Sequence, residues 1–204
     1  MLKKKFFFIV FEGTEGTGKS YQIDKLYRSL KKLRYKVIKT REPGGSKTAE
    51  LIRKVIFSNK SIQFDKLTDF YLMNAARNEH VKKTILFAKK NKHILISDRF
   101  TDSTYAYQVI GNKIDKKINL INQKYILKNL KPNLTIVLKA NMKTILARIK
   151  KRKNPLKSLI ISLKLFMVSL FIMDVIILKM IMLLLNLEKK MTFGYTQKTC
   201  QEVM

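Results

Sequence analysis

The fold expected for this 204-residue chain is decided by one stretch, Gly13-Thr14-Glu15-Gly16-Thr17-Gly18-Lys19-Ser20. The stretch matches the pattern G-x-x-x-x-G-K-[ST], in which glycines turn backbone N–H groups toward phosphate oxygens. The apolar run Phe6–Phe11 precedes it and predicts a strand that is buried on both faces. Apolar residues follow at helical spacing and predict an amphipathic helix; they are Ile23, Leu26, Leu30 and Leu33.

Strand patterns alternate with helical patterns over the first three quarters of the chain. Further strands are expected to open at Val37 and to span Ile94–Ile96 and Leu134–Leu138. Helices are expected over Thr48–Phe57, from Asp65 to about Ala88, over much of Ser103–Val109, over Asp115–Leu130 and over Met142–Lys151. Such alternation indicates a parallel sheet with crossover helices. The predicted fold class is therefore α/β, with the three-layer P-loop NTPase fold and a parallel sheet flanked by helices.

The composition bounds the partners and the compartment. The chain has 43 Lys and Arg residues against 14 Asp and Glu residues, a formal charge of +29, which favours polyanionic partners. The alternative is AT-rich codon usage that fills solvated faces with lysine. The basic residues are spread out and no nucleic-acid module is visible, so no nucleic-acid partner is expected. The one cysteine, Cys200, excludes an internal disulfide, and Phe6–Phe11 is too short for a signal peptide. We expect a cytoplasmic protein.

The glycine-rich stretch carries the first chemical expectation. Its backbone N–H groups and the following helix N-terminus suit a bound phosphate group. Lys19 can reach the β- and γ-phosphates, and the Ser20 hydroxyl can hold Mg²⁺. This motif by itself indicates only a nucleoside triphosphate, because GTPases, ATPases and kinases share it.

Four further segments, in this order, resemble the thymidylate kinase family. They are Phe11-Glu12-Gly13-Thr14-Glu15-Gly16, then Thr40-Arg41-Glu42-Pro43-Gly44-Gly45, then Asn74-Ala75-Ala76-Arg77, and finally Asp98-Arg99-Phe100 with Ser103, Thr104, Tyr107 and Gln108 behind it. The resemblance covers about residues 5–153. It implies an ATP-dependent dTMP kinase that forms dTDP for deoxynucleotide biosynthesis, with Mg²⁺ as cofactor and ATP and dTMP as partners. The resemblance also implies a homodimer.

The resemblance assigns a role to each matched position. It implies catalytic roles for Lys19, Asp98, Arg99 and Arg152 and metal contacts for Ser20, Glu15 and Asp98. The phosphate loop Gly13–Ser20 and Arg148 would bind ATP. The substrate dTMP would contact a larger set, in which Arg41 faces the phosphate and Arg77 the thymine: Glu15, Arg41, Met73, Arg77, Arg99, Ser103, Thr104, Tyr107 and Gln108.

Single residues in this set have simpler alternatives. Asp98 follows an apolar strand, where the carboxyl ends of parallel strands line a ligand crevice, but Asp is also a common helix N-cap. Arg41 and Arg99 suit bidentate contact with phosphate, although each alone is equally a surface arginine. Tyr107 would exclude a ribose 2′-hydroxyl or would lie in the core. His80 and His93 have no metal-ligating partners at useful spacing, and neither is assigned a function.

Two departures from the family pattern stand out. Met73 occupies the position where the family usually has a phenylalanine stacked on thymine, and a thioether can also pack on a ring. This departure keeps another deoxynucleoside monophosphate kinase open as an alternative. The second departure is the tail. No arginine follows Arg152, where the family places the catalytic lid, and Leu156–Leu187 is dominated by Leu, Ile, Met and Phe.

The tail divides the predicted organisation into a P-loop kinase domain, residues 1–153, and an aberrant segment, residues 154–204. The favoured interpretation of this segment is a frameshift near codon 154, which would leave the chain weak in nucleotide binding and slow in turnover. A divergent pair of core helices is the second interpretation. A membrane anchor over Leu165–Leu185 is the third, and it is opposed by the central charges Asp174 and Lys179. A basic nucleic-acid-binding P-loop protein and a membrane-attached P-loop protein remain as alternatives from other classes.

Overall fold

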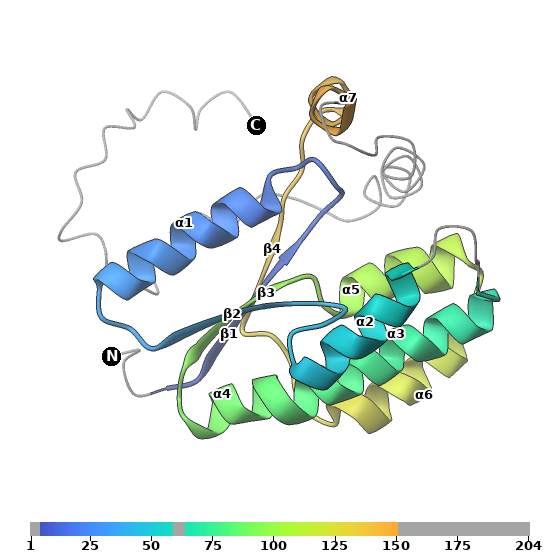
Figure 1. The fold of residues 1–204 in the computed structure, drawn as a ribbon, viewed down its shortest axis with the longest axis horizontal. Helices are drawn as coiled ribbons and strands as arrows, with labels where there is room; N and C mark the ends of the chain where they lie inside the picture. Colours follow the sequence, from blue (N-terminus) through green and yellow to red (C-terminus); the bar gives the residue numbers. More distant parts are fainter. Residues whose placement is uncertain (1–4, 59–63, 151–204) are drawn as a thin grey trace, which may run out of the picture. The chain divides into compact units, whose positions relative to one another are not determined.

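The computed structural model describes residues 5–58 and 64–150 (Figure 1). Arg152 and the tail predictions lie outside the described residues. In chain order the elements are β1 (Phe7–Glu12), α1 (Lys19–Lys32), β2 (Val37–Arg41), α2 (Lys47–Ser58), α3 (Lys66–His80), η2 (Val81–Ile85), α4 (Leu86–Lys90), β3 (Ile94–Asp98), α5 (Thr101–Thr104), η3 (Tyr105–Gly111), α6 (Lys116–Leu127), β4 (Leu134–Val137) and α7 (Met142–Lys150). The segments η2 and η3 are π-helical.

The strands form one parallel sheet in the order β2-β3-β1-β4. Asp98 at the end of β3 is in register with Phe11 of β1 and with Arg41 of β2. The carboxyl ends of three neighbouring strands therefore meet at one edge, which is where ligands bind in open α/β sheets. The predicted α/β class with a parallel sheet flanked by helices is confirmed.

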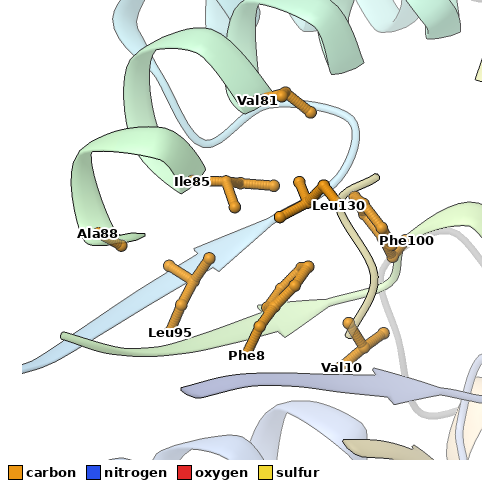
Figure 2. Packing of buried hydrophobic residues seen from close by; sticks show 8 residues of the cluster. All are labelled: Phe8, Val10, Val81, Ile85, Ala88, Leu95, Phe100 and Leu130. Carbon is orange, nitrogen blue, oxygen red and sulfur yellow. The ribbon is translucent and has the colours of Figure 1, made fainter. Parts of the chain in front are cut away.

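A hydrophobic cluster fills the space between one face of the sheet and the segments η2 and α4. Phe8 and Leu95 are partners in adjacent strands, and both side chains are fully buried. The Phe8 ring meets the Phe100 ring edge-on, with centroids 5.1 Å apart. Figure 2 shows the cluster: Phe8, Val10, Val81, Ile85, Ala88, Leu95, Phe100 and Leu130. Because Phe100 belongs to this cluster, the cluster anchors the end of the predicted Asp98-Arg99-Phe100 motif.

Helix α1 covers the opposite face of the sheet (Figure 1). Strand side chains alternate between the two faces, so Ile9 and Phe11 of β1 point away from the Phe8 cluster. Both are buried, as are Ile23 and Leu30 of α1. Helices on both faces of a parallel sheet give the three layers that the sequence predicts.

The helical boundaries differ from the sequence expectation in three places. The helix predicted from Asp65 to about Ala88 is interrupted by the π-helical segment η2. Asp65 itself is the N-cap of α3, and its side chain accepts a hydrogen bond from Leu67 N at 2.8 Å. The helix predicted to reach Leu130 ends at Leu127, because Lys128 takes a left-handed φ of 52°. The region around Ser103–Val109 divides into α5 and η3. Within residues 5–58 and 64–150, no helix has the length and apolar character needed to span a membrane.

Candidate active site

The phosphate loop joins β1 to α1 in a conformation that only glycine permits at its first position. Gly13 has a φ of +134°, and an added Cβ would collide with the Leu138 carbonyl oxygen. The Lys19 ammonium reaches back across the loop and donates to the carbonyl oxygens of Gly13 and Thr14 at 2.8 and 2.9 Å. The Thr17 hydroxyl also donates to the Thr14 carbonyl, at 2.8 Å. These bonds hold the loop closed around its own lysine.

The Lys19 side chain is an unusual ammonium group. Burial lowers its pKa from the ordinary value to about 8, and the positive charge of Arg99 adds to this effect. The carboxylates of Asp98 and Glu12 act in the opposite direction. A buried cation with this pKa in a glycine-rich loop is suited to binding a phosphate group.

A cavity of about 380 Å³ opens over this loop. It is lined by Lys19, Ser20, Glu15 and Asp98, so the residues predicted to hold a metal come together. The Asp98 Oδ1 atom is buried and has no hydrogen-bond partner among the described residues. A carboxylate oxygen and a serine hydroxyl that line the same cavity form a donor set that fits Mg²⁺, which prefers oxygen ligands. Asp98 is not the N-cap of α5, a position that Phe100 occupies.

A second cavity, of about 480 Å³, adjoins the first. The two cavities share Glu15, Glu42, Arg53 and Arg99 in their walls. Eight of the nine residues predicted to bind dTMP line the second cavity: Glu15, Met73, Arg77, Arg99, Ser103, Thr104, Tyr107 and Gln108. The structure therefore provides one cavity over the phosphate loop and a neighbouring one of suitable size for a nucleotide.

Arg99 occupies the junction between the two cavities. Its backbone has a φ of +72°, a conformation that is uncommon for a residue with a side chain. The Arg99 N–H donates to the Phe11 carbonyl at 2.9 Å, which fixes this conformation. The Arg99 Nη1 atom donates to the Ser103 hydroxyl at 2.9 Å, and the guanidinium carbon lies 5.3 Å from the Tyr107 ring centroid. Such strained positions are concentrated at functional sites.

Glu12 holds the residues around this junction through hydrogen bonds. Its carboxylate is buried and accepts hydrogen bonds from the Ser103 hydroxyl at 2.6 Å and from the Phe100 N–H at 2.8 Å. Burial raises the pKa of Glu12, and these hydrogen bonds act against the rise. The Ser103 hydroxyl therefore donates to Glu12 while it accepts from Arg99, which ties it to the protein rather than to a base edge.

Arg77 lies deep in the wall of the second cavity, with 4% of its side chain exposed. Its Nε atom donates to Glu42 Oε2 at 2.7 Å, and its Nη2 atom donates to the Thr104 hydroxyl at 2.7 Å and to the Phe100 carbonyl at 3.0 Å. The Nη1 atom is buried without a partner among the described residues. One guanidinium nitrogen thus remains uncommitted.

Arg41 is the predicted substrate residue that does not line the second cavity. Its guanidinium is half exposed and forms two hydrogen bonds with the Glu50 carboxylate, at 2.9 and 3.2 Å. It lines the cavity over the phosphate loop instead. Arg53 of α2 lines both cavities, and its Nη1 atom donates to the Pro43 carbonyl at 2.6 Å.

Arg148 of α7, which is predicted to bind ATP, reaches the phosphate loop. Its Nη1 atom donates to the Gly16 carbonyl at 2.9 Å. This contact joins residues 132 positions apart in the sequence. Arg148 is thereby held beside the loop that Lys19 crosses.

Sequence reasoning missed four residues of the site: Glu12, Glu42, Arg53 and His80. Glu12 carried a usable signal, because a carboxylate directly after a buried strand marks the ligand edge of a parallel sheet. Glu42 and His80 carried no such signal, because their partners are 35 or more positions away. No cluster of His, Cys, Asp and Glu with a metal-binding arrangement occurs in residues 5–58 and 64–150.

Comparison with known proteins agrees with this geometry. The family model described as thymidylate kinase matches residues 11–166. A thymidylate kinase of Mycoplasma capricolum is 44% identical over 129 residues, which cover 63% of this chain and 61% of that protein. A thymidylate kinase of Acholeplasma laidlawii is 39% identical over 146 residues, which cover 72% and 71%.

The fold is also found among solved structures. The crystal structure of thymidylate kinase from Ehrlichia chaffeensis matches with a TM-score of 0.64 and 29% identity, over 81% of this chain and 87% of that one. The phosphate loop, the paired cavities and the family model converge on one assignment. The chain belongs to the thymidylate kinase family.

Proposed function

We propose that this chain transfers the γ-phosphoryl group of ATP to dTMP, which gives ADP and dTDP. The observation that carries the proposal is the position of Arg99, whose side chain lines both the cavity over the phosphate loop and the neighbouring cavity. A guanidinium there contacts phosphate groups entering from either side. Positioning and charge neutralisation supply most of the catalysis in phosphoryl transfer, so no general base is needed.

The chain's own residues divide the work between donor and acceptor. Lys19 exchanges the Gly13 and Thr14 carbonyls for the β- and γ-phosphate oxygens of ATP. Arg148 contacts the nucleotide at the other side of the loop. Arg41 faces the phosphates from the end of β2, after release from Glu50.

Mg²⁺ is the proposed cofactor. The Ser20 hydroxyl and the carboxylates of Asp98 and Glu15 would hold it, directly or through water. When bound, the ion neutralises charge on the transferring phosphoryl group. The buried Asp98 Oδ1 atom, which has no hydrogen-bond partner in the part of the chain that the structure describes, supports this assignment.

The second cavity is the proposed dTMP site. The uncommitted Nη1 atom of Arg77 and the amide of Gln108 offer polar contacts to a pyrimidine edge, and Met73 packs on its face. Tyr107 is half-buried in the wall of this cavity and would exclude a ribose 2′-hydroxyl. Thr104 keeps a hydroxyl proton to donate, because its oxygen accepts from Arg77.

A single-turnover assay tests the proposal without depending on a fast enzyme. An excess of the full chain is mixed with γ-labelled ATP, dTMP and Mg²⁺, and labelled dTDP is followed by chromatography. Formation of dTDP by the wild type, and its loss in Lys19→Met, is expected. Hydrolysis of ATP to free phosphate with no dTDP would refute the proposal.

Competition among acceptors separates the proposal from a different deoxynucleoside monophosphate kinase. We expect dTMP to be preferred over dUMP and dCMP; a preference for dCMP would favour the alternative. Tight binding of single-stranded nucleic acid with a steep salt dependence would instead favour the nucleic-acid-binding class, given the net charge of +29.

We propose further that residues 154–204 lower the activity of this chain, as a frameshift near codon 154 would. Loss of a lid arginine costs ~10³–10⁵ in rate in related P-loop enzymes. Sequencing codons 150–160 and translating all three frames tests this proposal. It fails if no other frame encodes an Asp-Arg lid, or if the chain turns over like its intact relatives.

A homodimer in the cytoplasm is the proposed state of the protein. Helices α2, α3 and α6 expose apolar side chains that a second copy would cover, among them Leu51, Val55, Tyr71, Leu120 and Ile121. Sedimentation velocity at several concentrations tests the dimer, and a Leu51→Glu plus Tyr71→Glu variant is expected to sediment as a monomer.

A further inference from the structure

Four buried polar side chains form a chain from the end of β2 to the wall of the second cavity. They are Thr40, His80, Glu42 and Arg77, each at most 9% exposed. We propose that Glu42 and His80 are positioning residues that fix the orientation of Arg77 for binding the acceptor base. The inference rests on the proposed function for the identity of the ligand.

The bonds in this chain are short and continuous. The Glu42 carboxylate accepts from Arg77 Nε through Oε2 at 2.7 Å and contacts His80 Nδ1 through Oε1 at 2.9 Å. The other ring nitrogen of His80, Nε2, lies 2.8 Å from the Thr40 hydroxyl. Glu42 therefore grips Arg77 with one oxygen and is itself held by His80 with the other.

The donors and acceptors match in one arrangement of protons. Burial acts to raise the pKa of Glu42, but the Arg77 guanidinium and the His80 ring outweigh it and leave this pKa below its ordinary value. A carboxylate only accepts, so His80 Nδ1 carries the proton that it donates to Glu42. In a neutral ring, Nε2 then accepts from the Thr40 hydroxyl. The polar side-chain atoms of Thr40, His80 and Glu42 then all have partners, as a buried network requires.

Packing holds the network in place from the side of the 42–46 loop. Gly45 has a φ of +85°, and an added Cβ would come within 2.7 Å of His80 Nε2 and would also collide with the Thr40 hydroxyl. The Thr84 hydroxyl donates to the Gly45 carbonyl at 2.6 Å and anchors the same loop without touching Arg77. Thr84 therefore offers a matched control.

Energetics favour a positional role over a stabilising one. A fully buried ion pair such as Glu42–Arg77, with both side chains 4% exposed, seldom adds net stability compared with apolar residues of similar volume. What the pair does is direct the guanidinium. Nε and Nη2 are committed to Glu42, Thr104 and Phe100, so among contacts with residues 5–58 and 64–150 it is Nη1 that is left for a ligand.

Binding titrations on the full chain test the proposal without requiring turnover. Equilibrium dissociation constants for dTMP and for ATP are measured for the wild type, Glu42→Gln, His80→Phe, His80→Asn and Thr84→Val. We expect the dTMP constant to rise at least about tenfold in Glu42→Gln and several-fold in His80→Phe, because a buried charge loses its partner or its support. His80→Asn places an amide N–H near the position of Nδ1 and should recover most of the loss. The ATP constants should stay within about twofold in His80→Phe, His80→Asn and Thr84→Val, because His80 and Thr84 line neither cavity.

A second measurement separates failure of this inference from failure of the proposed function. In the wild type without ligand, the Arg77 Nε–H group should give a slowly exchanging, shifted NMR signal, assigned by its absence in Arg77→Lys. This signal should move or broaden in Glu42→Gln and His80→Phe and stay in place in Thr84→Val.

The inference is overturned if the signal is unchanged in Glu42→Gln, or if Thr84→Val weakens dTMP binding as much as Glu42→Gln does. Wild-type protein that shows the expected Arg77 signal but binds no dTMP would refute the proposed function instead. The effect of Glu42→Gln on that signal would then still decide whether Glu42 orients Arg77.

Discussion

The Lys19 ammonium nitrogen lies 2.9 Å from the Thr14 carbonyl oxygen, inside the loop where ATP phosphates are proposed to bind. Its pKa, lowered to about 8 mainly by burial, means that the free protein loses this charge as the pH rises through 8. Bound phosphate favours the charged form and raises the pKa again. ATP affinity is therefore linked to pH in this range.

We expect ATP affinity to be nearly constant from pH 7 to pH 7.5 and to fall about tenfold per unit above pH 8. Isothermal titration calorimetry across this range measures it, and the proton uptake that accompanies binding should grow with pH. Lys19→Met should bind ATP more weakly at every pH and show no such slope. Lys124→Met, on the exposed part of α6, is the control for loss of one positive charge. A pH-independent wild type would contradict the lowered pKa.

Arg99→Gly should separate function from folding. The left-handed backbone of Arg99 costs about 1–2 kcal/mol with a side chain present, while glycine loses about 0.5–1 kcal/mol more chain entropy on folding. The free energy of unfolding should thus stay within about 1 kcal/mol of the wild type, whereas dTDP formation in a single turnover should fall by at least about a hundredfold.

Arg34→Gly is the matched control for this substitution. Arg34 has a φ of 59° after α1 and lines none of the cavities described above. It should resemble Arg99→Gly in urea denaturation and the wild type in phosphoryl transfer. Equal losses of activity in both variants would rule out a specific role for Arg99.

Met73→Phe should raise the affinity for dTMP by roughly three- to tenfold, because an aromatic ring stacks on a base with about 0.5–1.5 kcal/mol beyond simple burial. Met73 lines the second cavity, which is the proposed dTMP site. Titration with dTMP measures the change. Leu72→Phe, at the neighbouring position outside the cavity lining, should leave the affinity unaltered. Weaker dTMP binding by Met73→Phe would remove Met73 from the base site.

Ile85→Ala should lower the free energy of unfolding by about 2–5 kcal/mol, since it removes buried methyl groups from the cluster between η2 and the sheet. Leu86→Ala, one position further and 41% exposed, should cost less than about 1 kcal/mol. Urea denaturation followed by circular dichroism compares the two. Similar losses in both variants would contradict the packing of η2 on the sheet.

Local patterns predicted much of the molecule. The buried run before Gly13, the helical spacing of Ile23 and Leu30, and the glycine-rich stretch itself gave β1, α1 and the loop between them. The π-helical segment η2 was not predicted, because five residues of π-helix do not change the helical spacing of apolar residues enough to be recognised in the sequence. The early end of α6 was likewise not predicted, because Lys128 takes a positive φ of 52° there although the sequence has no glycine at that position.

By itself, the sequence determined the α/β class, the phosphate loop with Lys19, and the identity of eight residues that line the second cavity. Only the tertiary structure decided that Arg41 is paired with Glu50, that Arg99 lies between two cavities, and that Glu42 and His80 hold Arg77. The physical reason is the distance along the sequence over which each feature is specified. A loop or an amphipathic helix is specified by neighbours within a few positions, whereas the partner of a buried charge is set by how the strands and helices pack. Glu42 and Arg77, which are 35 positions apart, meet only after β2 and α3 have packed.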